Sequence, residues 1–412
     1  MKIRRKTELR VVRDEEELMI NKLLTELQDE DMSKELGEQQ ENKKQLQKRR
    51  IFAAGIVGVV TAALAAFLYL PTYTSGTVVT SYHAEKASNN GYEQFSDGVL
   101  KYSRDGIAYL DKKSKEIWNH AYQIKNPFIE VYEKTAVVAD KGGNTIIVFD
   151  EKGVKGNIQT SLPIEKVAVS EQGIVSALLK NENAPKIVCY DTAGNMLVEL
   201  KTSFTGTGYP MDVSISSDGT LLLVPYMCVE NGKVITRIVY YSFAGETSVN
   251  KEFEVVKDSY EGMIAPTAFF VDDSISVVVG DDRLLLYKGK SNPTLFQTIM
   301  LEKEIKSVFH NDKYVGLVLK NEGKAGYELC LYNTSGKKVM SEEFTGDYTN
   351  AKIEKGQVLM YDGKKCCIFT RLGIHRFNGE INSNILEIFP VTGINKYIVM
   401  SENGMEIIRL SR

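Results

Sequence analysis

A short pattern recurs along residues 77–412 and limits the folds open to this chain more than any other feature. In each copy an alternating apolar run ends in an aromatic or Asp-like residue, turns tightly at a closing glycine, and continues as a second apolar run. The clearest copies are IIVFDEKG (146–153), VCYDTAG (188–194), IVYYSFAG (238–245), LCLYNTSG (329–336) and CIFTRLG (367–373). Each turn is expected to join two neighbouring antiparallel strands as a hairpin.

The spacing of these copies indicates the architecture. Their closing glycines lie 41, 51, 91 and 37 residues apart, and a degenerate copy, LLLYKGK at 284–290, divides the longest interval. A period of roughly 40 residues with about four strands per unit is typical of a β-propeller. Eight innermost strands can be placed, beginning near Tyr92, Asn126, Pro163, Tyr209, Met263, Glu304, Asp347 and Asn384. We therefore predict an all-β propeller of about eight four-stranded blades, with seven blades as the alternative.

The two ends of the repeat region predict how the ring closes. The last unit is one strand short, because only three predicted strands precede Arg412. Residues 77–83, TVVTSYH, supply an unassigned strand at the other end. We expect this strand to complete the last blade, since closure removes the open sheet edges that invite aggregation. Closure in this way favours eight blades over seven.

A second constraint precedes the repeats. Residues 51–70 are an unbroken run of twenty uncharged, mostly apolar residues, and Lys48, Arg49 and Arg50 stand directly before it. At about 1.5 Å per residue a helix of this length spans roughly 30 Å, the thickness of a hydrocarbon core. The basic flank predicts a cytoplasmic tail at 1–50 and an extracytoplasmic domain at 71–412. A cleaved signal peptide would have a shorter leading segment and a shorter apolar core.

The tail itself contains one periodic segment. Residues 14–28 are predicted to form an amphipathic helix, with Asp14 at the N-cap position and Ile20, Leu23, Leu24 and Leu27 on one face. A tail of fifty residues has no core of its own to cover that face. The segment therefore either contacts a cytoplasmic protein or the membrane surface, or remains a solvated helix.

Charge and cysteine content restrict the classes of partner. The chain has 51 Lys+Arg and 54 Asp+Glu, of which residues 1–50 hold 13 and 12, leaving 38 and 42 for the rest. A mildly acidic outer domain is a poor nucleic-acid binder, because that affinity comes mainly from neutralised phosphates. The five cysteines are odd in number and have no zinc-like or CxxC spacing, so we expect buried free thiols.

Catalytic, metal and cofactor signatures are absent from the sequence. The histidines His83, His120, His310 and His375 fall in different predicted blades. Asp272–Asp273 and Asp281–Asp282 flank the predicted strand ISVVVG at turn positions, which favours a structural role over a cation site. We therefore predict no catalytic residue, no metal site and no cofactor.

The best candidate for a binding surface is the longest unit. Its tyrosines gather in and around residues 205–262, and tyrosine rings on a propeller face can bind peptides or glycans by stacking and hydroxyl hydrogen bonds. Ordinary packing between strands is the alternative reading of the same residues. The candidate residues are Tyr209, Tyr226, Tyr240, Tyr241 and Tyr260.

The turn motifs, such as VCYDTAG at 188–194, resemble those of WD40-like and quinoprotein-like propellers. The layout from the charged tail through the apolar run to residue 412 is similar to that of an uncharacterised Gram-positive, chiefly clostridial, family of single-pass membrane-anchored propeller proteins. That resemblance implies no established activity. The chain departs from quinoprotein dehydrogenases because Trp118 is its single tryptophan, and from strict WD40 repeats because their Gly-His and Trp-Asp pairs are missing.

Together these patterns favour a propeller anchored in the cell membrane by residues 51–70. Its predicted function is that of a non-catalytic scaffold whose face binds an envelope protein or glycan. One alternative is a transmembrane sensor that couples outer ligand binding to a cytoplasmic partner. The other is a propeller enzyme, which requires His, Asp or Glu residues from different blades to converge on a central channel.

Overall fold

The computed structural model describes residues 19–20, 22–23, 25, 46–61, 72–83, 90–182, 184–243, 253–391 and 395–411. The chain divides into two compact units, Met1–Leu70 and Pro71–Arg412. Within the first unit residues 46–61 form a helix that includes the basic residues Lys48, Arg49 and Arg50. The second unit is all-β in the part that the structure describes.

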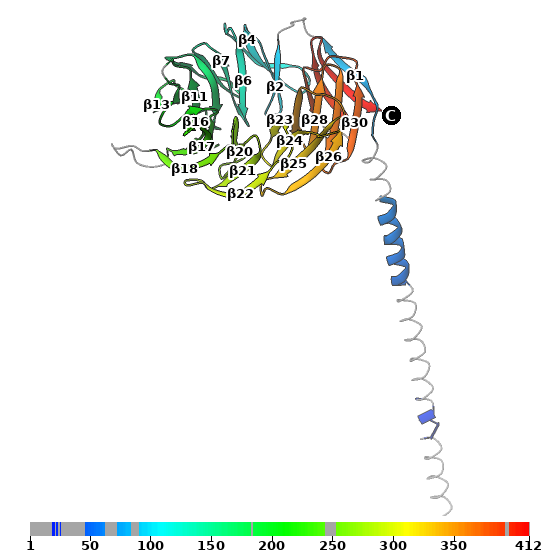
Figure 1. Ribbon diagram of the computed structural model, residues 1–412. Helices are drawn as coiled ribbons and strands as arrows, with labels where there is room; N and C mark the ends of the chain where they lie inside the picture. Colours follow the sequence, from blue (N-terminus) through cyan, green and yellow to red (C-terminus); the bar gives the residue numbers. More distant parts are fainter. Residues whose placement is uncertain are drawn as a thin grey trace, which may run out of the picture. The chain divides into compact units, whose positions relative to one another are not determined.

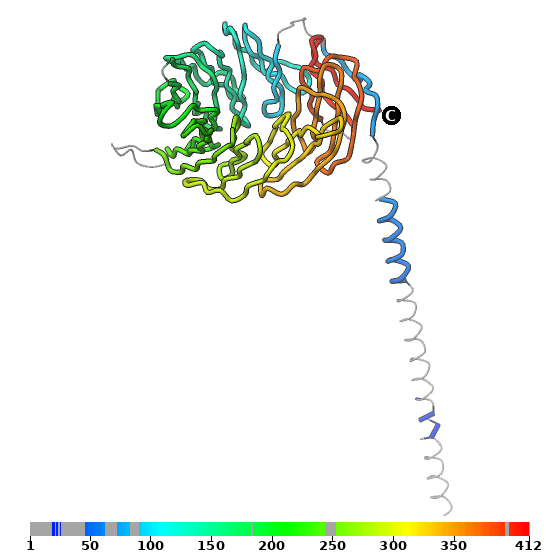
Figure 2. The backbone as a smooth tube through the Cα atoms, viewed as in Figure 1, coloured from blue at the N-terminus to red at the C-terminus, as the bar shows by residue number. Residues whose placement is uncertain are grey.

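Eight antiparallel sheets succeed one another around a ring in the second unit, and each is one blade of a β-propeller (Figures 1 and 2). The prediction of eight blades is therefore confirmed, and the alternative of seven is wrong. The eight innermost strands begin within a few residues of the predicted positions.

The strands of blades 1 to 4, from the innermost strand outward, are β2 (Gly91–Phe95), β3 (Gly98–Tyr102), β4 (Gly106–Leu110) and β5 (Glu116–Ala121); β6 (Pro127–Tyr132), β7 (Thr135–Asp140), β8 (Thr145–Asp150) and β9 (Gly153–Gln159); β10 (Ile164–Val169), β11 (Val175–Leu179), β12 (Lys186–Tyr190) and β13 (Met196–Lys201); and β14 (Tyr209–Pro210) with β15 (Ser214–Ile215), β16 (Leu221–Glu230), β17 (Lys233–Ser242) and β18 (Glu254–Glu261).

Those of blades 5 to 8 are β19 (Thr267–Phe270), β20 (Ile275–Val279), β21 (Arg283–Lys288) and β22 (Thr294–Met300); β23 (Ile305–His310), β24 (Tyr314–Lys320), β25 (Tyr327–Asn333) and β26 (Lys338–Phe344); β27 (Asn350–Glu354), β28 (Gln357–Asp362), β29 (Lys365–Thr370) and β30 (His375–Glu380); and β31 (Glu387–Pro390), β32 (Lys396–Ser401), β33 (Gly404–Ser411) and β1 (Ser75–His83).

The ring closes through β1, as predicted. This strand pairs antiparallel with β33, in a register that runs from Ser75 opposite Ser411 to His83 opposite Gly404. The residues before β1 add a further connection, because the Tyr73 amide donates to the Arg376 carbonyl of blade 7 at 2.8 Å. The first strand of the propeller thus forms the outer edge of its last blade.

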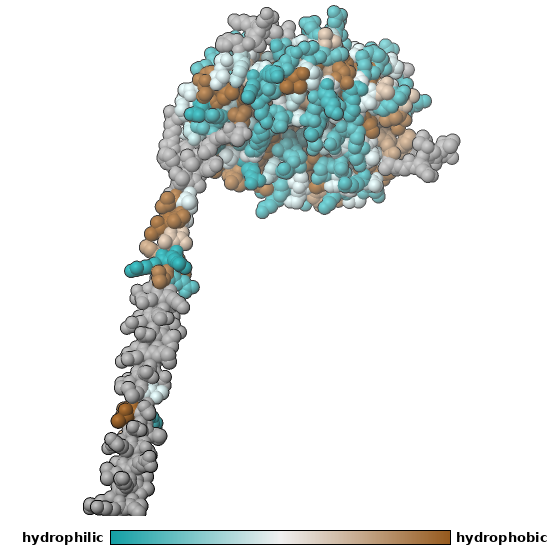
Figure 3. All heavy atoms as spheres, turned by 180° about the vertical axis from the view of Figure 1, so that it is seen from behind, coloured by the Kyte–Doolittle hydropathy of each residue, from teal (hydrophilic) through white to brown (hydrophobic). Residues whose placement is uncertain are grey.

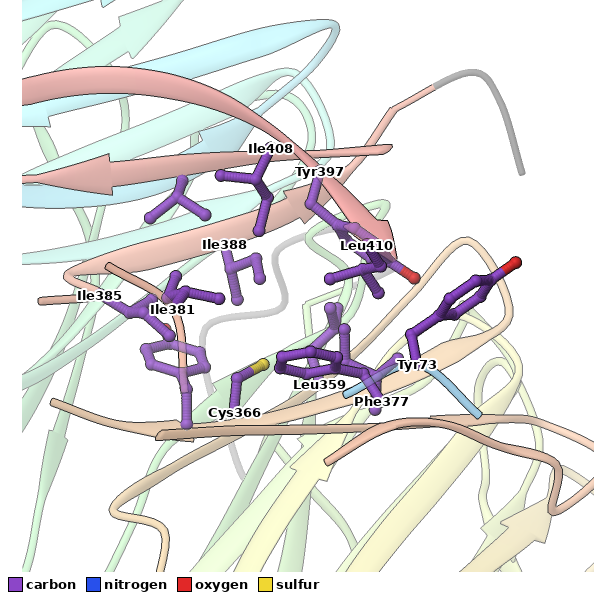
Figure 4. Close-up of a cluster of buried hydrophobic side chains, with 13 residues drawn as sticks. Tyr73, Leu359, Cys366, Phe377, Ile381, Ile385, Ile388, Tyr397, Ile408 and Leu410 are labelled. Carbon is purple, nitrogen blue, oxygen red and sulfur yellow. The ribbon is translucent and has the colours of Figure 1, made fainter. Parts of the chain in front are cut away.

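The core lies between adjacent blades, because both faces of each sheet are covered by a neighbour. At the closure, side chains of blades 7 and 8 interdigitate (Figure 4). Phe377, Ile388, Tyr397 and Leu410 are at most 2% exposed there. Burying such apolar side chains is the main stabilising contribution to folding.

The recurrent turn has the predicted structure. Gly153, Gly194, Gly336 and Gly373 all have positive φ, between 78° and 123°. In the turn at residues 333–336, the Asn333 side chain accepts hydrogen bonds from the amides of residues 335 and 337. These turns join the third and fourth strands of their blades, where only glycine adopts the required backbone conformation without strain.

The remaining predictions concern the cysteines and the helices before the propeller. All five cysteines are free and buried, as expected. In the described part of the chain, no helix is both long enough and apolar enough to cross a membrane. Residues 62–70 of the predicted span lie outside the described residues, as does most of the predicted helix at 14–28, of which residues 19–20, 22–23 and 25 are helical.

Candidate functional site

The antiparallel order of the strands gives the propeller two distinct faces. We call the face that carries the turns between the third and fourth strands, such as residues 150–153, the turn face. The opposite face carries the links between blades, such as residues 121–127, and we call it the connection face. The chain enters the propeller on the turn face, because β1 starts at Ser75 beside the end of β33.

The innermost strands of blades 2 to 6 line a central cavity of about 540 Å³. Lys166 and Asp212, from the neighbouring blades 3 and 4, form an ion pair at its wall, with 2.9 Å between Nζ and Oδ1. Glu130 also lines the cavity. Desolvation by the surrounding protein, followed by repulsion from the Asp212 carboxylate, raises the pKa of Glu130 to about 7. His310 stacks on Phe269 at 3.7 Å between ring centroids, and this burial lowers the pKa of His310 to about 4.

A second polar cluster lies on the innermost strands of blades 1, 7 and 8. The Lys352 ammonium is 2.6 Å from the Glu387 carboxylate and 4.0 Å from the centre of the Phe389 ring. Tyr361 donates a hydrogen bond of 2.8 Å to the same carboxylate. Burial, followed by repulsion from Glu387, raises the pKa of Glu93 to about 7. The pKa values of Glu93 and Glu130 are therefore both raised by burial, and perturbed carboxylates of this kind are found at sites of proton transfer and in structural ion-pair networks.

The sequence did not reveal these channel groups by motif spacing. They come from the innermost strands of blades 1 to 4, 7 and 8, so a charged residue within a predicted inner strand was the available signal. The members on the inner strands and their edges are Glu93, Glu130, Lys166, Asp212, Lys352 and Glu387.

The histidines do not form a common site. His120 lies on an outermost strand, His310 on an innermost strand, and His375 begins β30, where its ring stacks on Phe369 at 4.4 Å. Among the described residues, no three His, Cys, Asp or Glu side chains are grouped so as to hold a metal ion.

The paired aspartates of blade 5 serve turns and loops. Asp272 accepts hydrogen bonds from the amides of Ser274 and Ile275 at 2.7 and 2.8 Å. Asp281 accepts one from the amide of Ile264 at 3.0 Å. The two pairs lie at opposite ends of β20, so they do not form one carboxylate cluster.

The structure separates the five candidate tyrosines into two groups. Tyr226, Tyr240 and Tyr241 are 1%, 0% and 7% exposed. Tyr226 and Tyr241 share a hydroxyl hydrogen bond of 2.9 Å, and Tyr240 bonds Ser276 of blade 5 at 2.7 Å. These three side chains are packing residues within and between blades, so the expectation that they face a ligand is corrected by their burial.

The other two tyrosines retain exposed area. Tyr209 donates to the Glu165 carboxylate at 3.1 Å and stacks on Phe204, with 6.2 Å between ring centroids. Tyr260 shares a hydroxyl hydrogen bond of 2.8 Å with Tyr287. The binding hypothesis for this region therefore rests on the surroundings of Tyr209 and Tyr260.

Blade 4 projects further than the other blades on the connection face. Its second and third strands, β16 and β17, have 10 residues each, whereas the corresponding strands of the other blades have 5 to 8. The hairpin tip exposes 67% of Val229. Arg237 fixes the adjoining loop by donating to the carbonyls of Gly206 and Thr207, and it also pairs with Glu230.

The surface near this hairpin includes an exposed aromatic residue. Figure 3 shows a largely hydrophilic exterior with hydrophobic residues in small separate groups. Phe204 is 51% exposed on the loop that Arg237 holds against the hairpin. An exposed aromatic ring on a fixed loop is a feature typical of protein contact surfaces.

Comparison with known proteins identifies the family of the chain. The model of a family described as "Family of unknown function (DUF5711)" matches residues 69–410. The chain belongs to this family. No curated protein matches the sequence significantly. The clostridial origin and the membrane anchor of the similar family described above stay predictions.

Solved structures of other propellers are similar in fold. Sqt1 from Saccharomyces cerevisiae matches with a TM-score of 0.52 and 12% identity, over 83% of this chain and 100% of that chain. BamB from Moraxella catarrhalis matches with a TM-score of 0.49 and 13% identity, over 82% of this chain and 100% of that chain. A functionally unknown protein from Desulfotomaculum acetoxidans DSM 771 matches with a TM-score of 0.43 and 10% identity, over 79% of this chain and 100% of that chain. At these identities the similarity to Sqt1 shows the β-propeller fold alone.

Proposed function

We propose that this protein is a non-catalytic binding scaffold whose propeller contacts a protein partner through blade 4. The observation that carries the proposal is the extended β16–β17 hairpin, with Val229 exposed at its tip and Phe204 exposed beside it. Apolar and aromatic side chains that stand on a rigid element lose little conformational entropy on binding, and they dominate the energetics of interfaces.

The polar groups around these side chains support a specific contact. Lys233 and Glu261 form an exposed ion pair near the tip of the hairpin, with 2.6 Å between Nζ and Oε1. Charged groups at the rim of an apolar patch select partners and steer association. The pairing of Arg237 with Glu230 and with the neighbouring loop keeps the hairpin and Phe204 in one arrangement.

The scaffold is proposed to sit at the outer face of the cell membrane. The apolar run at 51–70 and the basic residues Lys48, Arg49 and Arg50 support a single span with a cytoplasmic N-terminus. A cytoplasmic protein at residues 14–28 would convert the scaffold into a sensor. Alkaline phosphatase fused after Arg412 is expected to be active in cells, whereas the same enzyme fused before Met1 is expected to be inactive. The opposite pattern contradicts the orientation.

Photocrosslinking in intact cells tests the contact surface. A photoreactive residue at Val229 is expected to capture a partner, and the same residue at Leu372 is the control, because Leu372 is 74% exposed on the turn face. Phe204→Asp is expected to abolish capture from position 229. Equal capture from both positions, or capture that Phe204→Asp leaves unchanged, contradicts the proposed surface. Deleting residues 1–50 distinguishes the sensor, since a pure scaffold keeps both partner capture and phenotype.

One observation favours a second candidate, a propeller enzyme with its site in the channel. Glu93 and Glu130 both titrate near pH 7, and Lys166, Asp212 and His310 line the same cavity as Glu130. A Glu93→Gln, Glu130→Gln variant separates the two functions. Loss of the cellular phenotype with full partner capture at Val229 favours the enzyme, whereas an unchanged phenotype favours the scaffold.

A further inference from the structure

Three cations converge on a second cavity, which lies between blades 1 and 2 on the connection face and measures about 500 Å³. Arg104 comes from the turn between β3 and β4, Lys125 from the link between the blades, and Lys141 from the turn after β7. All three side chains are exposed. The remaining lining residues are neutral, and they are Asn90, Gly91, Tyr102, Ser103, Asn126, Pro127 and Phe128.

Backbone hydrogen bonds hold the three cationic segments together. The amide of Ile124 donates to the Arg104 carbonyl at 2.9 Å, which ties the link between blades to the β3–β4 turn. The amide of Lys141 donates to the Asn126 carbonyl at 2.9 Å, and the Asn126 side chain donates to the Lys141 carbonyl at 3.3 Å. The backbone positions of the cations are therefore fixed by the fold.

Among the described residues, neither a carboxylate nor another hydrogen-bond acceptor pairs with the side chains of Arg104, Lys125 or Lys141. Two carboxylates adjoin these cations in sequence. Asp105 follows Arg104 but lines a different cavity, and the Asp140 carboxylate accepts the Asn126 amide at 2.9 Å. By contrast, Lys166 and Lys352 on the inner strands are both paired with carboxylates.

We propose that this cavity binds the anionic group, a phosphate or a carboxylate, of a small ligand. Arg104 supplies a planar fork of donors that fits either group, and Lys125 and Lys141 supply point charges. Ser103, Asn90 and Asn126 add neutral polar groups at the same wall. A cavity of this volume is in the range of small-molecule sites, and Tyr102 and Phe128 offer ring surface to an apolar part of the ligand.

The position of the cavity relates it to the channel. Phe128 and Lys141 line both this cavity and the central one. The anion site therefore lies beside the central cavity on the connection face. The inference is independent of the contact proposed for blade 4, because no residue of that hairpin lines this cavity.

Calorimetric titration of the full-length protein in detergent tests the site, with pyrophosphate and citrate as the two probes. The pocket variant is Arg104→Gln with Lys125→Gln. The matched control is Lys313→Gln with Lys337→Gln, which removes the same charge from exposed turns of the turn face. We expect at least one probe to bind, and its affinity to fall about ten-fold or more in the pocket variant, because charge-assisted hydrogen bonds are lost.

The pattern of results decides the inference. Tighter binding of pyrophosphate assigns the site to a phosphate, and tighter binding of citrate assigns it to a carboxylate. An affinity that falls equally in the pocket and control variants overturns the proposal, because it shows attraction to overall charge. Failure of both probes to bind the unmodified protein also overturns it. The substituted side chains are exposed, so both variants are expected to fold, which circular dichroism checks.

Discussion

The closure of the ring predicts a large cost for a substitution at Leu410, near the end of β33. Leu410 is 1% exposed and belongs to the cluster between blades 7 and 8. Leu410→Ala removes three buried side-chain carbons, worth about 0.8 kcal/mol each in transfer free energy. The cavity left behind adds to this loss, so the free energy of unfolding is expected to fall by about 3 kcal/mol.

Urea unfolding of the full-length protein measures this change. Trp118, the single tryptophan, stacks on Phe149 in blades 1 and 2 and reports unfolding by its fluorescence. Leu372→Ala is the control, because a leucine that is 74% exposed is expected to change the free energy of unfolding by less than about 0.5 kcal/mol.

The reasoning fails if Leu410→Ala behaves like the control. Terminal residues are usually frayed unless another element holds them, and a frayed Leu410 would lose little on truncation. A small effect would therefore show that β1 does not fix β33 in solution. A large effect in Leu410→Ala together with a small effect in Leu372→Ala supports closure by β1.

Three further predictions concern turns, titration and thiols. Gly336→Ala is expected to destabilise the propeller by about 1 kcal/mol in urea unfolding, because residue 336 has a φ of 78°, and an unchanged midpoint contradicts this reading of the turn. The pKa of Glu130 is about 7 in the folded protein and 4.5 for a free glutamate side chain, so its contribution to stability is present below pH 4.5 and is lost as the pH rises through 7. Glu130→Gln is therefore expected to reduce the pH dependence of the urea midpoint between about pH 5 and pH 8, and an unchanged pH dependence contradicts this prediction. Burial raises the pKa of Cys367 to about 12, so this thiol is expected to react with a disulfide reagent only after unfolding. Mass spectrometry of the native protein after treatment with the reagent checks this, and modification of Cys367 refutes it.

The fold was predictable because its repeating unit is local. The turn chemistry at glycines such as Gly194 and Gly336 marks one hairpin per blade, and the period between copies gives the blade number. The closure also followed from counting, since one strand was missing near Arg412 and one was spare at residues 77–83. Both signals depend on chain order alone.

The channel groups were harder to predict because they depend on ring geometry. Glu93 and Glu387 are far apart in sequence and meet only because β2 and β31 belong to adjacent blades of a closed ring. The tyrosines were misread for a related reason. Blades are covered on both faces, so alternation along β16 and β17 does not separate buried residues such as Tyr226 and Tyr240 from exposed ones.

The pairing of β1 with β33 makes synthesis of the last blade a condition for completion of the ring. β1 is among the first parts of the propeller to be synthesised, but its partner Gly404–Ser411 is the last. Until then β1 has an unpaired edge, and forming the pair requires closure of a very long loop. A chain that stops within blade 8 leaves the ring open with exposed strand edges, which are targets for aggregation and proteolysis. The pairing of β33 with β1 thus reports that all eight blades have been synthesised.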